Sequence, residues 1–196
     1  MDALVDPTVS QVKFDREVAQ FRELEDHYRE IGWWMLRVKF PQITVAFANP
    51  KLVPPAVIFG VDLNFENYDL WPPSVRLVNP FTRVAYTNTQ LPSRMLRMVP
   101  TQGPPGQPTL MTIQDMLQAH GPDQIPFLCL PGVREYHDHP AHTGDSWLLH
   151  RTKGEGTLNF ILTQLYKYGV EPISGYDFAL QVTVKSFTRN LGGVPQ

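Results

Sequence analysis

The sequence predicts a single α+β domain over residues 1–196, with an N-terminal helix, a four-strand antiparallel meander, a long loop and a C-terminal helix. Three patterns predict this class. Apolar residues recur at helical spacing over residues 13–31, four short segments with strand character follow, and helical spacing returns over residues 157–168. Helices and strands that are segregated along the chain in this way are typical of α+β folds.

The first helix is predicted from apolar residues three or four positions apart, which form one face of an amphipathic helix. Gly32 follows them, and glycine commonly ends a helix. We expect the opposite, polar face to be solvated. The apolar positions are Phe14, Val18, Phe21, Leu24, Tyr28 and Ile31.

Four segments then have strand character, residues 33–40, 43–48, 56–65 and 74–78. The third alternates strictly, as expected of a strand with one buried face. The first ends at Pro41, and alternation gives it a buried side as well. The residues expected on that side are Trp34, Leu36, Val38 and Phe40.

The segment after the meander is rich in turn-forming residues. Several of the 19 prolines fall within residues 91–108, and because proline removes a backbone donor we predict a loop there. Thr112 to Asp115 resemble a capping box and predict a short helix that ends near Gly121.

The last third contains the second long helix, over residues 157–168, with Gly169 as its stop. Residues 177–187 predict a final strand.

Composition excludes several classes of function. With a formal charge of −2 the chain lacks a basic field for phosphate backbones, so we expect no nucleic-acid partner. No apolar run approaches the ~18 residues of a membrane span, and no basic segment followed by an apolar run marks a secretory signal. We therefore expect a cytoplasmic protein.

A motif in the third and fourth strand segments resembles the ubiquitin-conjugating enzymes. The alternating run over residues 57–65 is followed by Tyr68, Pro72-Pro73 and Val75. This spacing is similar to that family's Tyr-Pro-x-x-Pro-Pro-x-Val motif, and the element order over roughly residues 13–80 is also similar. The resemblance implies a ubiquitin-conjugating-enzyme-like fold.

The resemblance also implies a catalytic residue. In that family the catalytic cysteine follows the fourth strand, precedes a leucine and is followed later by a tryptophan, which here implies Cys129, Leu130 and Trp147. The chain departs from the pattern at Asp69, where the family has proline, and in a longer stretch before the cysteine. Residues 120–122 read His-Gly-Pro, without the family's asparagine, so no residue is assigned to stabilise the oxyanion.

A second resemblance involves Cys129, Glu135, His137 and His139. Their spacing is similar to bacterial proteins described as predicted metal-binding domains of the Cys-Glu-His-His pattern. Those proteins occur in compact operons with ubiquitin-like proteins, activating enzymes and deubiquitinase-like peptidases. The likeness implies a bacterial ubiquitin-like conjugation pathway in antiphage defence.

Together the resemblances imply a transferase that accepts a ubiquitin-like protein from an activating enzyme as a thioester on Cys129. The acceptor would be a lysine of a target protein, and no organic cofactor is required. In this interpretation Cys129 lies on an exposed loop, where a bulky partner reaches the sulfur. His137 or His139 would lower the thiol pKa, and Glu135, Asp138 or Asp145 would orient the imidazole or deprotonate the attacking amine.

Two other interpretations remain open. Four of the six histidines, His137, His139, His142 and His150, lie within fourteen residues. Cys129, His137 and His139, with Glu135 or His142, have the residue types of a tetrahedral zinc site. The chain would then be a zinc-binding accessory domain that binds the modifier or its enzymes without catalysis, or a metal-dependent hydrolase with Glu135 as base.

The third interpretation gives Cys129 no chemistry. The residue stands between Leu128 and Leu130 and would be a buried apolar side chain, with the histidines on the surface.

Overall fold

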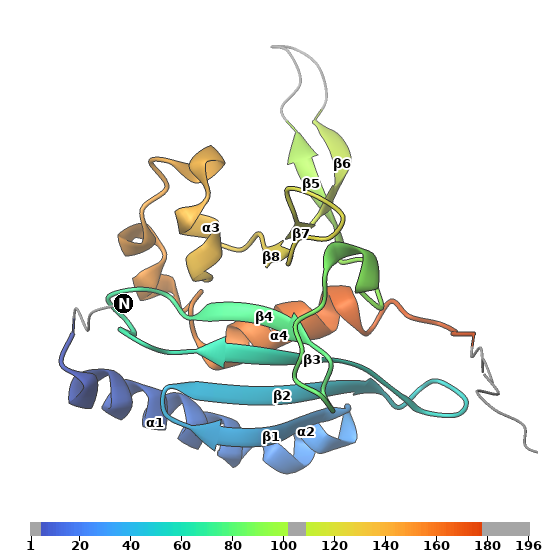
Figure 1. The fold of residues 1–196 in the computed structure, drawn as a ribbon, viewed down its shortest axis with the longest axis horizontal. Coiled ribbons are helices and arrows are strands. Elements are labelled where there is room, and N and C mark those ends of the chain that lie inside the picture. The colour runs from blue at the N-terminus through green and yellow to red at the C-terminus, as the bar shows by residue number, and fades with distance from the viewer. Residues whose placement is uncertain (1–4, 102–108, 178–196) are drawn as a thin grey trace, which may run out of the picture.

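An antiparallel sheet with strand order β1-β2-β3-β4 forms the centre of the fold (Figure 1). The computed structural model describes residues 5–101 and 109–177. Each strand of the predicted meander is confirmed to within one residue at either end. The strands are β1 (Trp33–Lys39), β2 (Gln42–Asn49), β3 (Ala56–Asn64) and β4 (Ser74–Val78).

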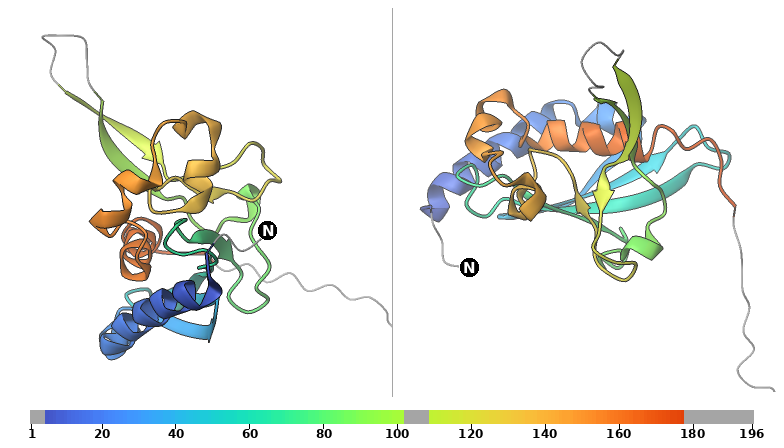
Figure 2. Two further views of the ribbon diagram at one scale, coloured as in Figure 1. Left: turned by 90° about the vertical axis from the view of Figure 1, so that its left-hand side faces the viewer. Right: turned by 90° about the horizontal axis from the view of Figure 1, so that it is seen from above.

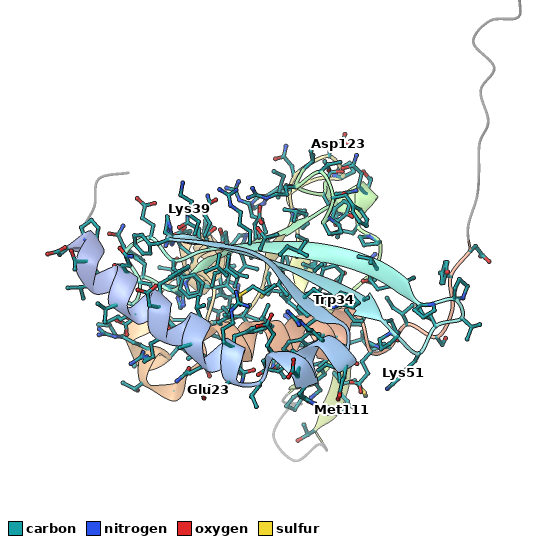
Figure 3. The ribbon with its side chains drawn as sticks, turned by 90° about the horizontal axis from the view of Figure 1, so that it is seen from below. Glu23, Trp34, Lys39, Lys51, Met111 and Asp123 are labelled. Atoms are coloured by element: carbon teal, nitrogen blue, oxygen red, sulfur yellow. The ribbon has the colours of Figure 1, made fainter. Side chains whose placement is uncertain are left out.

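The buried face of β1 differs from the predicted one. A bulge between Met35 and Arg37 shifts the register against β2, and a bulge reverses which side chains face the core. Before the bulge Trp33 is buried, while Trp34 and Leu36 are exposed. After the bulge, the predicted residues Val38 and Phe40 do pack against the core. Trp34 and Lys39 mark the two ends of the strand in Figure 3.

Helices α1 (Pro7–Glu23) and α4 (Leu158–Gly169) lie side by side on one face of the sheet (Figure 2). The predicted C-terminal helix is therefore confirmed. Its first turn is capped by Thr157, whose hydroxyl oxygen accepts the Phe160 N–H at 3.3 Å. At its end, a Cβ on Gly169 would lie 2.6 Å from Met95 Cε and 3.1 Å from the Phe59 ring, so the helix packs closely against both side chains.

The predicted first helix is in fact two helices. α1 begins earlier, where the Asp6 carboxylate caps the chain and Pro7 supplies the first helical residue. The helix breaks at Leu24, and α2 (Glu25–Glu30) follows. Because of the break, Leu24 is exposed instead of facing the core. Gly32 ends the helical region with φ of +93°, as expected.

The core lies between the sheet and the helices. Within it the rings of Phe14 and Phe65 pack edge to face, with centroids 5.6 Å apart. Fully buried side chains come from α1, the sheet and α4 and include Phe14, Phe47, Phe59, Leu63, Leu158 and Ile161.

One polar side chain of α1 enters this core, contrary to the prediction of a solvated polar face. The side chain of Glu17 is only 2% exposed. Its carboxylate accepts the Leu158 backbone N–H at 2.9 Å and the Tyr68 hydroxyl at 3.2 Å. Burial raises the pKa of this carboxyl group above its ordinary value.

A two-stranded antiparallel hairpin occupies part of the predicted proline-rich loop and part of the predicted short helix. β5 (Leu96–Thr101) pairs with β6 (Leu110–Asp115). The hairpin extends away from the central sheet, with Met111 exposed on it (Figures 1 and 3). The loop predicted over residues 91–108 is confirmed at residues 91–95, is wrong at residues 96–101, and lies outside the described residues at 102–108. The predicted short helix is wrong, because backbone pairing with β5 overrides the local propensity of residues 112–115.

The remaining elements lie beside the free edge of β4. They are β7 (Leu117–Gln118), β8 (Phe127–Leu128), α3 (Arg134–Asp138) and single 3₁₀ turns at Asn88–Gln90, Pro140–His142, Trp147–Leu149 and Arg151–Lys153. The strand predicted at residues 177–187 falls outside the described residues except for its first position. Within the described ranges, no helix has the length and apolarity needed to cross a bilayer.

Candidate functional site

Cys129 comes directly after β8 and is the buried residue from which the site is described. Its backbone N–H donates to the Met116 carbonyl at 2.7 Å. Leu128 and Leu130 on either side are buried, and Cys129 itself is 1% exposed. The prediction of an exposed cysteine loop is therefore wrong, because the flanking leucines and the backbone bond hold this segment in the core.

His142 is the histidine nearest the thiol, with Nε2 3.6 Å from Cys129 Sγ. Burial raises the pKa of the Cys129 thiol, and the positive charge of Arg97 opposes this only in part. Burial also lowers the pKa of His142, as does the neighbouring His139. Both shifts favour a neutral thiol beside a neutral imidazole in the closed structure.

His142 stacks on Tyr136, with ring centroids 3.8 Å apart and an interplanar angle of 24°. The Tyr136 hydroxyl donates to Asp145 Oδ2 at 2.6 Å, and burial raises the pKa of this hydroxyl. The other Asp145 oxygen faces His150 Nε2 at 2.7 Å, and His150 Nδ1 contacts the Glu155 carboxylate.

These contacts shift the pKa values of Asp145 and His150 in opposite directions. Hydrogen bonds from His150 and Tyr136 lower the pKa of Asp145. Burial lowers the pKa of His150, but hydrogen bonds to Asp145 and Glu155 outweigh it and leave that pKa raised. The pair therefore favours a charged carboxylate beside a protonated imidazole.

The two histidines assigned to Cys129 by sequence contact other groups. The ring nitrogens of His137 face the backbone carbonyls of Asp145, at 2.9 Å, and Pro131. The ring of His139 stacks on those of Phe127 and His120, with centroids 5.0 Å and 5.3 Å away.

Glu135 points away from the thiol toward the start of β4. Its carboxylate accepts the Ser74 hydroxyl and, at 3.2 Å, the Val75 backbone N–H. The neighbouring Arg134 donates to the carbonyls of Pro72 and Glu66. The hydrogen bonds of Glu135 and Arg134 thus hold α3 against residues 66–75, the segment that leads into β4.

The predicted zinc ligands Cys129, Glu135, His137 and His139 do not converge. Across residues 5–101 and 109–177, no three or more histidine, cysteine, aspartate or glutamate side chains form a group suited to a metal ion. Zinc needs about four such ligands around one point, so the described geometry does not provide the predicted set.

A pocket of about 540 Å³ opens on the far side of His142. Leu70 and Trp71 line it from the segment before β4, and His137 and residues 142–148 line the rest. The indole N–H of Trp147 donates to the Asp69 carbonyl at 3.0 Å and joins the two walls. His142 therefore both lines the pocket and contacts the Cys129 thiol.

Sequence reasoning missed the roles of Tyr136 and His150. It included His142 only as a possible zinc ligand and Asp145 only as a general orienting group. A cysteine–histidine separation of thirteen residues through two turns carries no periodic signal, so spacing alone could not identify the partner of the thiol.

The comparisons with known proteins concern the whole chain. The family model described as Y4jH-like, Y4jH family, matches residues 5–173. The chain belongs to the Y4jH-like family. A protein y4jH of Sinorhizobium fredii (strain NBRC 101917 / NGR234), described as uncharacterized, is 44% identical over 187 residues. The match covers 92% of this chain and 91% of the relative, so the two share the whole domain with the site.

Proposed function

We propose that this Y4jH-like chain is a conjugating-type transferase that carries a ubiquitin-like protein as a thioester on Cys129. The activating enzyme supplies the thioester and a protein lysine receives the modifier. The observation that carries this proposal is the contact between Cys129 Sγ and His142 Nε2, 3.6 Å apart. A thiol with an imidazole within reach is the arrangement of an activated cysteine nucleophile.

The order of the elements supports the proposal. Helix α1, the meander and the Tyr68 to Pro73 segment precede Cys129, and Trp147 and α4 follow it. This is the order that the resemblance to ubiquitin-conjugating enzymes implies. Trp147 also contacts the Asp69 carbonyl, which brings the tryptophan next to the motif that carries the resemblance.

In the proposed reaction Cys129 is the nucleophile and His142 is its general base. His142 Nε2 takes the thiol proton while the sulfur attacks the carbonyl carbon of the incoming thioester. The bond to the donor sulfur breaks, and the departing thiolate takes up the proton. An amine then attacks the new thioester, an amide bond forms, and its proton returns the Cys129 sulfur to the thiol.

Access to the thiol requires a local opening. Cys129 is 1% exposed, and the His142 side chain that contacts its sulfur belongs to a residue that lines the pocket. The segment that carries His142 is a single 3₁₀ turn, Pro140–His142, instead of a long helix. Docking of the activating enzyme would displace this segment and expose the sulfur.

The test is a charging assay with the ubiquitin-like protein and activating enzyme of the same organism and ATP, resolved on a gel without reductant. We expect a band heavier by one modifier that thiol removes and that is absent in Cys129→Ala. His142→Gln, which keeps the bulk of the side chain but is not a base, should slow charging about 10²-fold or more. His27→Gln on α2 is the matched histidine control.

No charged band with a demonstrably active activating enzyme would refute the proposal. Stoichiometric zinc that leaves only on unfolding would support the zinc-binding accessory domain instead. The antiphage role stays a prediction.

A further inference from the structure

The strongest unassigned feature is the set of side chains behind His142. Resting on the proposed function, we infer that Tyr136 is a positioning residue that holds the His142 imidazole against the Cys129 thiol. Tyr136 in turn takes its orientation from Asp145, which His150 and Glu155 hold in place. The network regulates the same site instead of adding a second one.

The first link is the ring stack. Tyr136 lies against His142 with centroids 3.8 Å apart and planes inclined by 24°. A flat contact of this kind limits rotation of the imidazole about its side-chain bonds. It thereby keeps Nε2 directed at Cys129 Sγ.

The second link fixes Tyr136 itself. Its hydroxyl donates to Asp145 Oδ2 at 2.6 Å, and Asp145 Oδ1 accepts from His150 Nε2 at 2.7 Å. Both carboxylate oxygens are therefore engaged. His150, whose side chain is 13% exposed, also bonds Glu155 through its other nitrogen.

The third link returns the network to the backbone beside the thiol. A Cβ on Gly132 would fall 1.6 Å from the Glu155 carbonyl oxygen, so these two backbone segments are in direct contact. Gly132 lies three residues after Cys129. The contacts therefore run from the thiol through His142, Tyr136 and Asp145 and come back to the chain near their start.

The network sets how readily the thiol loses its proton. With Nε2 held in place, His142 accepts the thiol proton and stabilises the thiolate. If the imidazole turns away, burial acts on the thiolate without this compensation. The charged group that faces the thiol from the hairpin is Arg97, and its contribution stays constant in the variants below.

The test measures iodoacetamide alkylation of Cys129 in the full chain as a function of pH. The plateau rate at high pH reports access, and the pH midpoint reports proton loss. Tyr136→Leu removes the stack and should slow alkylation at pH 7, relative to its own plateau, by about tenfold. Tyr136→Phe keeps the ring but loses the bond to Asp145, and should slow it by about threefold.

A double-mutant cycle decides whether the effect passes through Asp145. Asp145→Asn and Tyr136→Phe should shift the midpoint in the same direction, and the double variant should shift it no further than the larger single effect. Tyr28→Phe is the matched control, since it removes a hydroxyl that donates to Asn159 of α4 at 2.8 Å and contacts no member of the network.

Unchanged midpoints in both Tyr136 variants, or additive shifts in the cycle, would overturn the positioning role. Alkylation needs neither the modifier nor the activating enzyme. A failed charging assay with an intact cycle would therefore refute the proposed transferase and leave the network standing.

Discussion

At the scale of single residues, Glu17 shows how one side chain connects distant parts of the fold. It accepts the first backbone N–H of α4 and the hydroxyl of Tyr68 from within the core. A negatively charged group near a helix N-terminus is stabilised by the helix dipole, but burial disfavours the charged form. The raised pKa shows that burial prevails.

We therefore predict a specific pH dependence. Because the native pKa of Glu17 lies above its ordinary value of 4.5, its contribution to stability is full below that pH and declines as pH rises through the native pKa. The Glu17→Gln side chain does not ionise. The free energy of unfolding of this variant, relative to that of wild type, should therefore be higher at pH 8 than at pH 5. Urea unfolding at both values measures this, with Glu23→Gln on the same helix as control. A constant difference between wild type and Glu17→Gln would contradict it.

Glu135 gives a second prediction, which separates structure from chemistry. Removing its carboxylate leaves the Ser74 hydroxyl and the Val75 N–H without their acceptor. Glu135→Ala should lower the free energy of unfolding by about 1–3 kcal/mol. The alkylation profile of Cys129 should stay that of wild type. A normal stability with a shifted profile would restore Glu135 to the catalytic role that the sequence assigned to it.

At the scale of elements, the hairpin presents an apolar face that the described residues leave exposed. Met98 and Ile113 face each other across the ladder and are 65% and 71% exposed. Met116, just beyond β6, is fully buried. Ile113 and Met116 are therefore expected to contribute very different amounts to the free energy of unfolding.

This contrast is measurable by chemical denaturation. Ile113→Thr keeps a β-branched residue on an exposed strand and should change the unfolding free energy by about 0.5 kcal/mol or less. Met116→Ala opens a cavity in the core and should cost about 2–5 kcal/mol. Similar losses at both positions would mean that the face of the hairpin is covered in the folded protein.

The elements also show where sequence reasoning succeeds. β3 and α4 follow from periodicity, because the apolar positions of each recur at the spacing of a strand or a helix, and most of these positions are buried in the core. The bulge in β1 and the pairing of β5 with β6 depend on backbone contacts with the next strand, which the residue pattern of a single segment does not encode. Cys129 could be singled out by composition, whereas its partner His142 depends on how two turns fold over it.

At the scale of the whole molecule, the fold has two parts (Figure 2). The first is the sheet with helices α1 and α4, and the second is the site, which lies beside the β4 edge of that sheet. Asp69 joins the two parts, since its carboxylate pairs with Lys13 of α1 and with Arg151. These ion pairs outweigh burial and lower the pKa of Asp69. The Asp69 carboxylate therefore links α1 to the 3₁₀ turn that carries Arg151.

Because the chain's one cysteine is buried, its rate of alkylation in the native protein reports local opening of the structure around it. When reclosing is faster than reaction, the ratio of the rate in the native protein to that of an unfolded thiol equals the equilibrium constant for local opening. Each tenfold of protection then corresponds to about 1.4 kcal/mol of opening free energy. The same sulfur thus measures how far the structure around it stands from the open state, with no probe added to the sequence.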